Sequence, residues 1–123
     1  MEAILDTNFI ISCVMKKIDF IEQLKELGFT PILPREVFQE LKDLQLKNKT
    51  SHDERTAIDV AFQLFESAKV KKTKLGGASV DDGLIKKGKE GIHIATLDNG
   101  IKMRVPNKIV IQNAQKRVAV ERS

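Results

Sequence analysis

The fold is decided by the stretch Ala3-Ile4-Leu5-Asp6-Thr7-Asn8. Its apolar residues predict a short buried strand, and the polar residues after them predict the start of a helix. A similar apolar run, Ile92-His93-Ile94-Ala95, comes shortly before Asp98. Both acidic residues therefore follow strands, and open α/β sheets bind ligands at the carboxyl ends of their strands. We expect Asp6 and Asp98 to hold a ligand together from neighbouring strands.

Segments with strand and helix patterns alternate along the 123 residues. Helical spacing of apolar residues or capping signals predict helices over 9–14, 20–27, 35–46, 54–67, 79–87 and 100–105. Short apolar or alternating runs predict strands over 3–5, 30–33, 69–74, 92–95 and 108–111. This order predicts one α/β domain over residues 1–123, with a central, mostly parallel sheet covered by helices on both faces. A basic C-terminal tail is expected from about residue 113.

The composition is that of a globular protein, with 41% hydrophobic and 31% charged residues. No apolar run reaches the length of a bilayer span, and the first residues lack the basic region of a signal peptide. The single cysteine, Cys13, lies among apolar residues and is expected to be buried and reduced. These features predict a cytoplasmic protein with no membrane partner.

The net charge is +4, and the basic residues gather in segments. Three lysine-rich segments contain Lys69, Lys71, Lys72 and Lys74, then Lys86, Lys87 and Lys89, then Lys102, Arg104 and Lys108. Six Phe, and no Trp or Tyr, are available to stack on bases. If the chain binds nucleic acid, contacts with phosphates should dominate.

Four acidic residues stand out, although each has an ordinary structural explanation. Asp6 suits a helix N-cap, Asp82 suits a capping arrangement with Ser79, and Asp98 suits a turn. Glu40 lies at the border of an apolar helical stripe, whereas Glu36 and Asp43 are expected to point further toward solvent. Taken together, the four acids match the oxygen ligands that two divalent ions need for in-line displacement at a phosphate.

Four blocks of sequence carry a resemblance to a known family. They are Ile4-Leu5-Asp6-Thr7-Asn8-Phe9-Ile10, Pro34-Arg35-Glu36-Val37-Phe38-Gln39-Glu40-Leu41, Asp81-Asp82-Gly83-Leu84-Ile85 and Ala95-Thr96-Leu97-Asp98. In this order and spacing they resemble the PIN domain family, over essentially the whole chain. The resemblance implies a compact α/β fold with a parallel sheet, and metal-dependent cleavage of RNA at an acidic pocket.

The resemblance also assigns residues. It implies that the metal-binding and catalytic acids, which would hold Mg²⁺ or Mn²⁺, are Asp6, Glu40, Asp82 and Asp98. Asp81 is the alternative to Asp82, with a shift of one residue. The polar residues that match positions supporting the first and last acids are Thr7, Asn8 and Thr96.

The substrate and partners stay open at this stage. The Asp-Asp pair and the Pro106–Ile111 ending favour the branch that processes ribosomal RNA, while toxin-type ribonucleases of toxin–antitoxin pairs share the same acids. The RNA would be single-stranded or structured, with rRNA and tRNA as the expected classes. The protein partners to consider are a second copy, a ribosome-assembly factor and an antitoxin. A binding module with little or no nuclease activity is the rival interpretation; a phosphate-accepting receiver domain is disfavoured because Glu40 lies in a helix.

Overall fold

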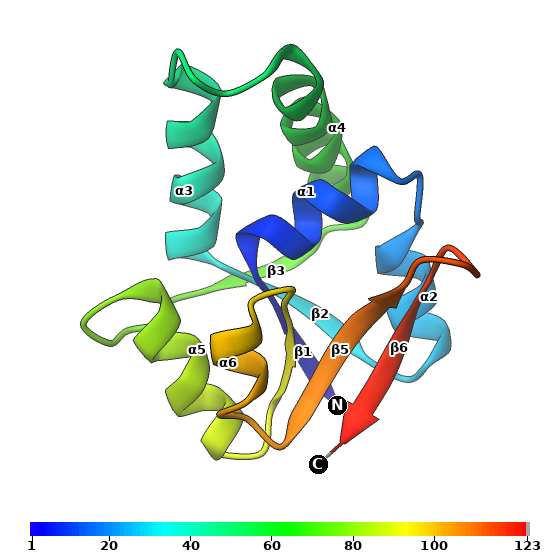
Figure 1. The fold of residues 1–123 in the computed structure, drawn as a ribbon, viewed down its shortest axis with the longest axis vertical. Coiled ribbons are helices and arrows are strands. Elements are labelled where there is room, and N and C mark those ends of the chain that lie inside the picture. Colours follow the sequence, from blue (N-terminus) through cyan, green and yellow to red (C-terminus); the bar gives the residue numbers. More distant parts are fainter. Residues whose placement is uncertain (123) are drawn as a thin grey trace.

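The structure is a computed structural model that describes residues 1–122. Strands and helices alternate along most of the chain (Figure 1). The elements are β1 (Glu2–Leu5), α1 (Thr7–Met15), α2 (Phe20–Glu26), β2 (Thr30–Pro34), α3 (Arg35–Leu46), α4 (His52–Ser67), β3 (Lys71–Thr73), α5 (Val80–Lys89), β4 (His93–Ala95), α6 (Asn99–Lys102), β5 (Asn107–Gln112) and β6 (Arg117–Arg122).

The strands form one sheet in the order β3-β2-β1-β4-β5-β6. All pairs are parallel except β5 with β6. The chain therefore builds outward from β1 in one direction through β2 and β3, and in the other through β4 and β5. The predicted mostly parallel α/β sheet is confirmed, and the strand order reverses between β1 and β4. In sheets of this kind the ligand crevice lies at such a switch point, beyond the carboxyl ends of the strands.

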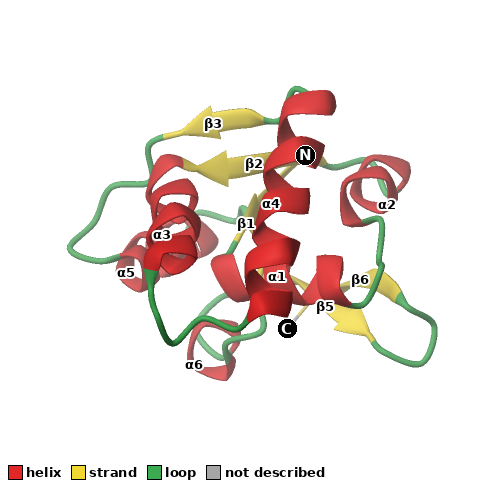
Figure 2. Ribbon diagram, turned by 90° about the horizontal axis from the view of Figure 1, so that it is seen from above, coloured by secondary structure: helices red, strands yellow, loops and turns green. Residues whose placement is uncertain are grey.

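Side chains alternate between the two faces of the sheet, and each face has its own core. Ala3 and Leu5 of β1 face the larger core, which also includes apolar residues of α1, α2, α3 and α4. Ile4 and Ile94 face a smaller core with residues of α5 and α6. Figure 2, seen from above, shows β3 at the outer edge of the sheet beside β2.

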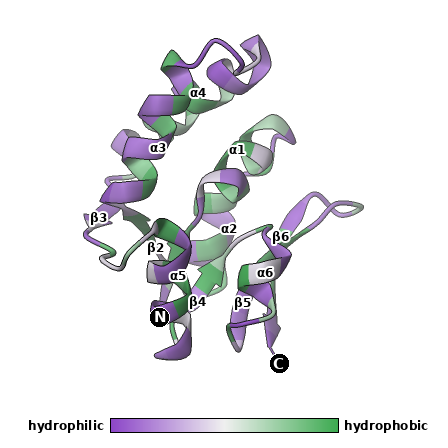
Figure 3. Cartoon of the chain, turned by 60° about the vertical axis from the view of Figure 1, so that its left-hand side comes forward, coloured by the Kyte–Doolittle hydropathy of each residue, from purple (hydrophilic) through white to green (hydrophobic). Residues whose placement is uncertain are grey.

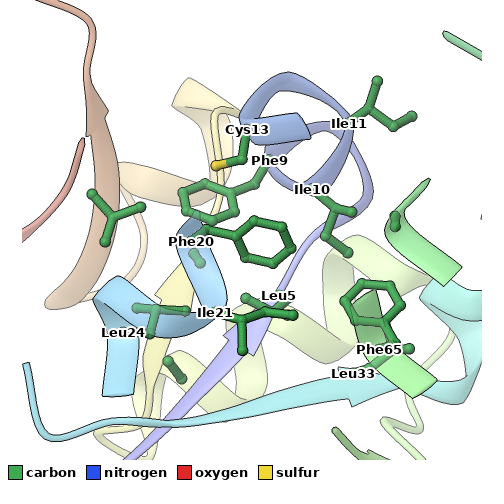
Figure 4. Close-up of a cluster of buried hydrophobic side chains, with 14 of the residues drawn as sticks. Leu5, Phe9, Ile10, Ile11, Cys13, Phe20, Ile21, Leu24, Leu33 and Phe65 are labelled. Atoms are coloured by element: carbon green, nitrogen blue, oxygen red, sulfur yellow. The ribbon is translucent and has the colours of Figure 1, made fainter. Parts of the chain in front are cut away.

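Aromatic rings lie at the centre of the larger core (Figure 4). Phe20 makes edge-on contacts with Phe9 and Phe65, at centroid distances of 6.2 and 6.3 Å. Cys13, on the same helix as Phe9, is fully buried, as expected. Burial raises the pKa of its thiol to about 12, so the thiol stays protonated at neutral pH.

The predicted basic tail is wrong. Arg117–Arg122 form β6, which pairs antiparallel with β5 from Asn107↔Arg122 to Gln112↔Arg117. Val118 and Val120 of this strand pack toward the larger core. The spacing of these two valines, with period two, is the strand signal that charge at the terminus obscured.

Several helix boundaries differ from the prediction by a few residues, and two of them have a clear physical cause. Helix α4 begins at His52 rather than residue 54, because Ser51 and Glu54 form a reciprocal capping box. Helix α6 ends at Lys102 instead of continuing to Val105. Val105 leaves the helix and packs in the smaller core, and the proline that follows it disfavours helical geometry at this position.

Two exposed segments near α3 and α4 are strongly polar. Figure 3 shows the loop between α3 and α4 and the short strand β3 in the hydrophilic colours. Within residues 1–122, no helix has both the length and the apolar character that a membrane crossing requires.

Candidate active site

The site begins at the switch point of the sheet, where β1 and β4 end side by side. Leu5 of β1 pairs with Ala95 of β4, and the next backbone N–H, that of Asp6, donates to the Ala95 carbonyl at 2.9 Å. This pairing brings Asp6 beside Thr96 although the two residues are 90 positions apart in the chain. The expected convergence of the first and last motifs thus occurs at the carboxyl ends of neighbouring parallel strands.

Asp6 is both a helix cap and the buried acid of this site. One carboxylate oxygen accepts the backbone N–H of Thr7 at 2.8 Å, and the other accepts the hydroxyl of Thr96 at 2.7 Å. The residue is only 8% exposed. Burial raises the pKa of Asp6; the bonds from Thr96 and Thr7 oppose this shift, and the negative charges of Glu40 and Asp81 add to it. The carboxylate is therefore well oriented, but its charge is poorly compensated.

Glu40 approaches Asp6 from helix α3. Its side chain is exposed, and one carboxylate oxygen accepts the hydroxyl of Thr7 at 2.6 Å. Thr7 thus contacts both acids, through its backbone N–H to Asp6 and through its hydroxyl to Glu40. This short bridge holds the second acid next to the first.

Asp98 is connected to the same group through Thr96. Its backbone N–H donates to the Thr96 hydroxyl oxygen at 3.1 Å, and its carboxylate accepts the N–H of Ile101 at 3.0 Å as the N-cap of α6. The capping explanation of Asp6 is correct, and Asp98, for which the sequence suggested a turn, is also a helix cap. These caps do not compete with a role in a site, because a capping carboxylate oxygen keeps a second lone pair.

Asp6, Glu40 and Asp98 border one hollow of about 380 Å³. Three of the four acids predicted from the sequence line this hollow, together with Asp81, the predicted alternative to Asp82. The lining acids of this set are Asp6, Glu40, Asp81 and Asp98. Of the three supporting polar residues, Thr7 and Asn8 also line it, while Thr96 is fully buried beneath Asp6.

Asp82, the first choice from the sequence, is not among the lining residues. Its backbone N–H donates to the hydroxyl of Ser79, the N-cap of α5. Asp81, one residue earlier, lines the hollow and contributes to the raised pKa of Asp6. The arrangement favours the alternative register, with Asp81 as the acid that α5 contributes.

Sequence reasoning missed three further residues of the hollow, namely Asp43, Leu44 and Lys47. Asp43 was expected to point away from the apolar stripe of α3. It does, and it lines the hollow. Glu40, Asp43 and Leu44 follow the spacing i, i+3 and i+4, which places them on one face of α3, and Lys47 follows as the C-cap of this helix. That spacing was the available signal. Lys47 contributes a cation among the acids.

Glu36 was expected to point toward solvent, but its carboxylate binds a loop instead. It is half-buried and accepts hydrogen bonds from the backbone N–H groups of Leu75 and Gly76, at distances of 2.9 to 3.1 Å. Partial burial opposes ionisation of Glu36, but these donors and the charge of Lys74 lower its pKa overall. One turn before Glu40, α3 therefore holds the loop that leads to Asp81.

One predicted phosphate contact is not available. Lys108 is 8% exposed, and its ammonium group donates to the carbonyls of Lys102 and Val105. These two hydrogen bonds from the buried Lys108 side chain stabilise the turn that follows α6. His93, expected to be an ordinary strand residue, is buried in β4, where its ring lies against Phe29.

The donor set of the hollow suits a hard divalent cation. Within residues 1–122, no three His, Cys, Asp or Glu side chains converge closely enough to enclose a metal ion by themselves. Mg²⁺ usually keeps several waters and takes one or two carboxylates together with substrate phosphate, so a closed set of three is not required. The pKa of Asp6 is raised chiefly by burial, with a further contribution from the charges of Glu40 and Asp81, and a bound cation would favour the ionised carboxylate. The residues present therefore fit a hydrated Mg²⁺ or Mn²⁺ centred on Asp6.

Comparisons with known proteins agree with this architecture. The solved structure of the PIN domain endonuclease Utp24 superposes with a TM-score of 0.74 and 24% sequence identity, over 99% of this chain and 92% of that one. A comparison with curated protein sequences gives no match. The profile described as a PIN like domain matches residues 3–116, and the chain therefore belongs to the PIN-like domain family.

Proposed function

We propose that the chain is a metal-dependent endoribonuclease. The observation that carries the proposal is the gathering of Asp6, Glu40, Asp81 and Asp98 around one hollow at the switch point of the sheet. These acids come from the ends of β1 and β4 and from helices α3 and α5. The chain is also similar in structure to the PIN domain endonuclease Utp24.

A divalent ion bound here would activate a water molecule and neutralise charge at the scissile phosphate. Asp6 would hold it, because Thr7 and Thr96 fix the carboxylate and leave a lone pair on each oxygen. Glu40 and Asp98 line the same hollow and would accept hydrogen bonds from the ion's waters. Lys47 would contact a phosphate oxygen and orient the strand.

The reaction expected at this site is an in-line displacement. The water oxygen forms a bond to phosphorus while the bond to the 3′ oxygen breaks, and the departing oxygen takes up a proton. The products are a 5′-phosphate and a 3′-hydroxyl end. We favour RNA as the substrate because the family resemblance implies it and the chain has a net charge of +4. Processing of ribosomal RNA is the role that the motif details favour, and a toxin-type ribonuclease is the alternative.

A second candidate is an RNA-binding assembly factor with little or no nuclease activity. It is favoured by one observation, that no three ligating side chains converge within the described residues. This candidate predicts RNA affinity that depends on salt and survives loss of the acids. It also predicts no cleavage at any concentration of Mg²⁺ or Mn²⁺.

The deciding experiment is a time course on 5′-labelled single-stranded RNA with Mn²⁺. The wild-type chain is compared with Asp6→Asn purified in the same way, so that a contaminating nuclease appears in both samples. Cleavage by the wild type alone supports the nuclease. Cleavage by both would remove Asp6 from the mechanism, and binding without cleavage by both would favour the assembly factor.

A further inference from the structure

A second hollow, of about 610 Å³, lies on the other side of helix α3. It is bounded by α3, α4 and the segment leading into the edge strand β3. The lining residues that matter here are Phe38, Lys42, Phe62, Glu66, Lys69 and Lys72. We call it the basic aromatic hollow, because two rings and three lysines dominate this set.

The two rings lie against each other. The centroids of Phe38 and Phe62 are 5.0 Å apart, with a tilt of 51° between their planes. Both side chains are only partly buried. The ammonium groups of Lys72 and Lys42 lie 4.0 and 4.7 Å from the centroid of the Phe38 ring. Two cations thus share one aromatic ring at the wall of a hollow.

These cations lack a carboxylate to neutralise them. Within residues 1–122, Lys42 and Lys72 form no ion pair, and the ring of Phe38 is their attractive contact. A ring quadrupole attracts a cation but adds no negative charge, and two ammonium groups on one ring repel each other. Glu66 is the one acid against three lysines in the lining. The hollow therefore carries an excess of positive charge that an anionic ligand would balance.

The two hollows are related through α3. Glu40 and Asp43 line the acidic hollow, while Phe38 and Lys42 line the basic aromatic one. At 100° per residue these pairs project from nearly opposite faces of the helix. A strand with one phosphate in the acidic hollow would reach the other hollow by crossing a single helix, which is about 10–12 Å wide. A few nucleotides cover that distance.

We propose that the basic aromatic hollow binds a segment of single-stranded RNA a few nucleotides away from the phosphate that is cleaved. Lys42 and Lys72 contact its phosphates, and a base stacks on Phe62, the ring that no cation covers within the described residues. This inference rests on the proposed ribonuclease function, since it assigns a second contact for the same substrate.

A protein partner fits this surface less well. An amphipathic helix would need a mainly apolar groove, whereas lysines stand on the wall of this one. Strand addition at β3 is disfavoured by the lysines that this short edge strand carries, because charge on an edge discourages pairing. RNA supplies negative charge and a flat ring together, which are the two features that the hollow can bind.

The test compares two pairs of lysines in the full chain. The double variant Lys42→Gln/Lys72→Gln removes two charges from the hollow. The matched control, Lys17→Gln/Lys25→Gln, removes two exposed charges from the turn after α1 and from α2. The probe is a 5′-fluorescein-labelled oligouridine of about twelve nucleotides, within the usual length range of single-strand sites. Anisotropy is measured in EDTA across a salt series, so that binding is separated from metal-dependent cleavage.

We expect the hollow variant to bind roughly tenfold more weakly than the wild type. The slope of log affinity against log salt should fall by about 1.4, because each phosphate contact to a single strand contributes about 0.7. The control pair should change both quantities much less. Phe62→Leu should weaken binding and leave the salt slope unchanged, since stacking carries no charge.

Cleavage in Mn²⁺ separates this inference from the proposed function. If the inference is correct, the hollow variant has a higher KM for the long oligonucleotide, an unchanged kcat, and wild-type cleavage of an RNA too short to reach the hollow. Wild-type binding and KM in the hollow variant, or equal losses in both lysine pairs, overturn the inference while the nuclease stands. A wild-type chain that neither binds nor cleaves RNA overturns both.

Discussion

Replacing Asp6 by Asn should abolish cleavage and at the same time stabilise the fold. The carboxylate is 8% exposed, and its pKa is raised by burial and by the charges of Glu40 and Asp81. Asn has the same shape and removes the charge, so it removes both the desolvation cost and the repulsion. A residue kept for packing alone would show the opposite result, because most substitutions at buried positions destabilise.

The size of the effect follows from the contacts. An Asn oxygen can still accept the N–H of Thr7, so the cap of α1 survives. The Thr96 hydroxyl loses a charged acceptor, which costs on the order of 1 kcal/mol. Relief of a poorly compensated buried charge gains roughly 1–2 kcal/mol. The net gain of up to about 1 kcal/mol corresponds to a Tm higher by roughly 2–5 °C in a domain of this size.

The pH dependence of the Tm difference tests more sharply whether the charge of Asp6 causes the stabilisation. Because the folded-state pKa of Asp6 is raised, the folded chain binds its proton more tightly than the unfolded chain does. The cost of ionising Asp6 is fully present above the folded-state pKa and disappears below the unfolded one. The Tm advantage of Asp6→Asn should therefore be largest at neutral pH and shrink as the pH falls through the acidic range.

The matched control is Asp19→Asn. Asp19 is also an aspartate N-cap, with its side chain accepting the N–H of Glu22, but it caps α2 and lies outside the acidic hollow. Asn caps as well as Asp does, so this variant should keep wild-type cleavage and a Tm within about 2 °C. The reasoning on Asp6 is refuted if Asp6→Asn melts lower than wild type at neutral pH, or if its advantage grows as the pH falls.

Three further variants or reactions test the surroundings of the site. Glu36→Gln keeps one acceptor for the loop before α5 and should cost roughly 1 kcal/mol in urea unfolding at neutral pH. Because the pKa of Glu36 is lowered, this loss should disappear as the pH falls through that pKa. Gly83→Ala would place a methyl group 2.5 Å from the Gly76 carbonyl oxygen; we expect a loss of roughly 1–3 kcal/mol and reduced cleavage, measured by thermal melting and by the RNA time course. Cys13, with its pKa near 12, should react with a thiol reagent at pH 8 only in the unfolded chain, as followed by mass spectrometry.

The sequence predicted structure correctly where a signal within a few neighbouring residues determines the local conformation. The apolar run before Asp6 predicted β1 and the polar residues after it predicted α1, because both signals lie within a few neighbouring residues. The position of Asp6 and Asp98 at strand ends was predictable for the same reason. That β1 and β4 are neighbours depends on packing between segments about 90 residues apart, and only the alternation of strands and helices hinted at it.

Other features depend on rotations or contacts that local patterns do not determine. A shift of one residue on a helix turns a side chain by about 100°, so the choice between Asp81 and Asp82 depends on how α5 packs. Glu36 has a solvent-facing pattern, yet it accepts two N–H groups of a loop about 40 positions away. The basic tail was misread because Val118 and Val120 find a partner surface only once β5 is in place.

Contacts on both sides of one loop determine the separation between Glu40 and Asp81, two of the exposed acids of the site. From α3, Glu36 binds the backbone N–H groups of the loop at Leu75 and Gly76. From α5, the hydrogen of Gly83 leaves just enough space for the Gly76 carbonyl, where a methyl group would clash. Since Glu40 lies one turn after Glu36, and Asp81 two residues before Gly83, both acids stand next to the contacts that hold the loop. Strengthening or loosening this loop should therefore alter metal affinity before it alters the fold, because the repulsion between Glu40 and Asp81 resists their approach and the contacts of the loop oppose that repulsion.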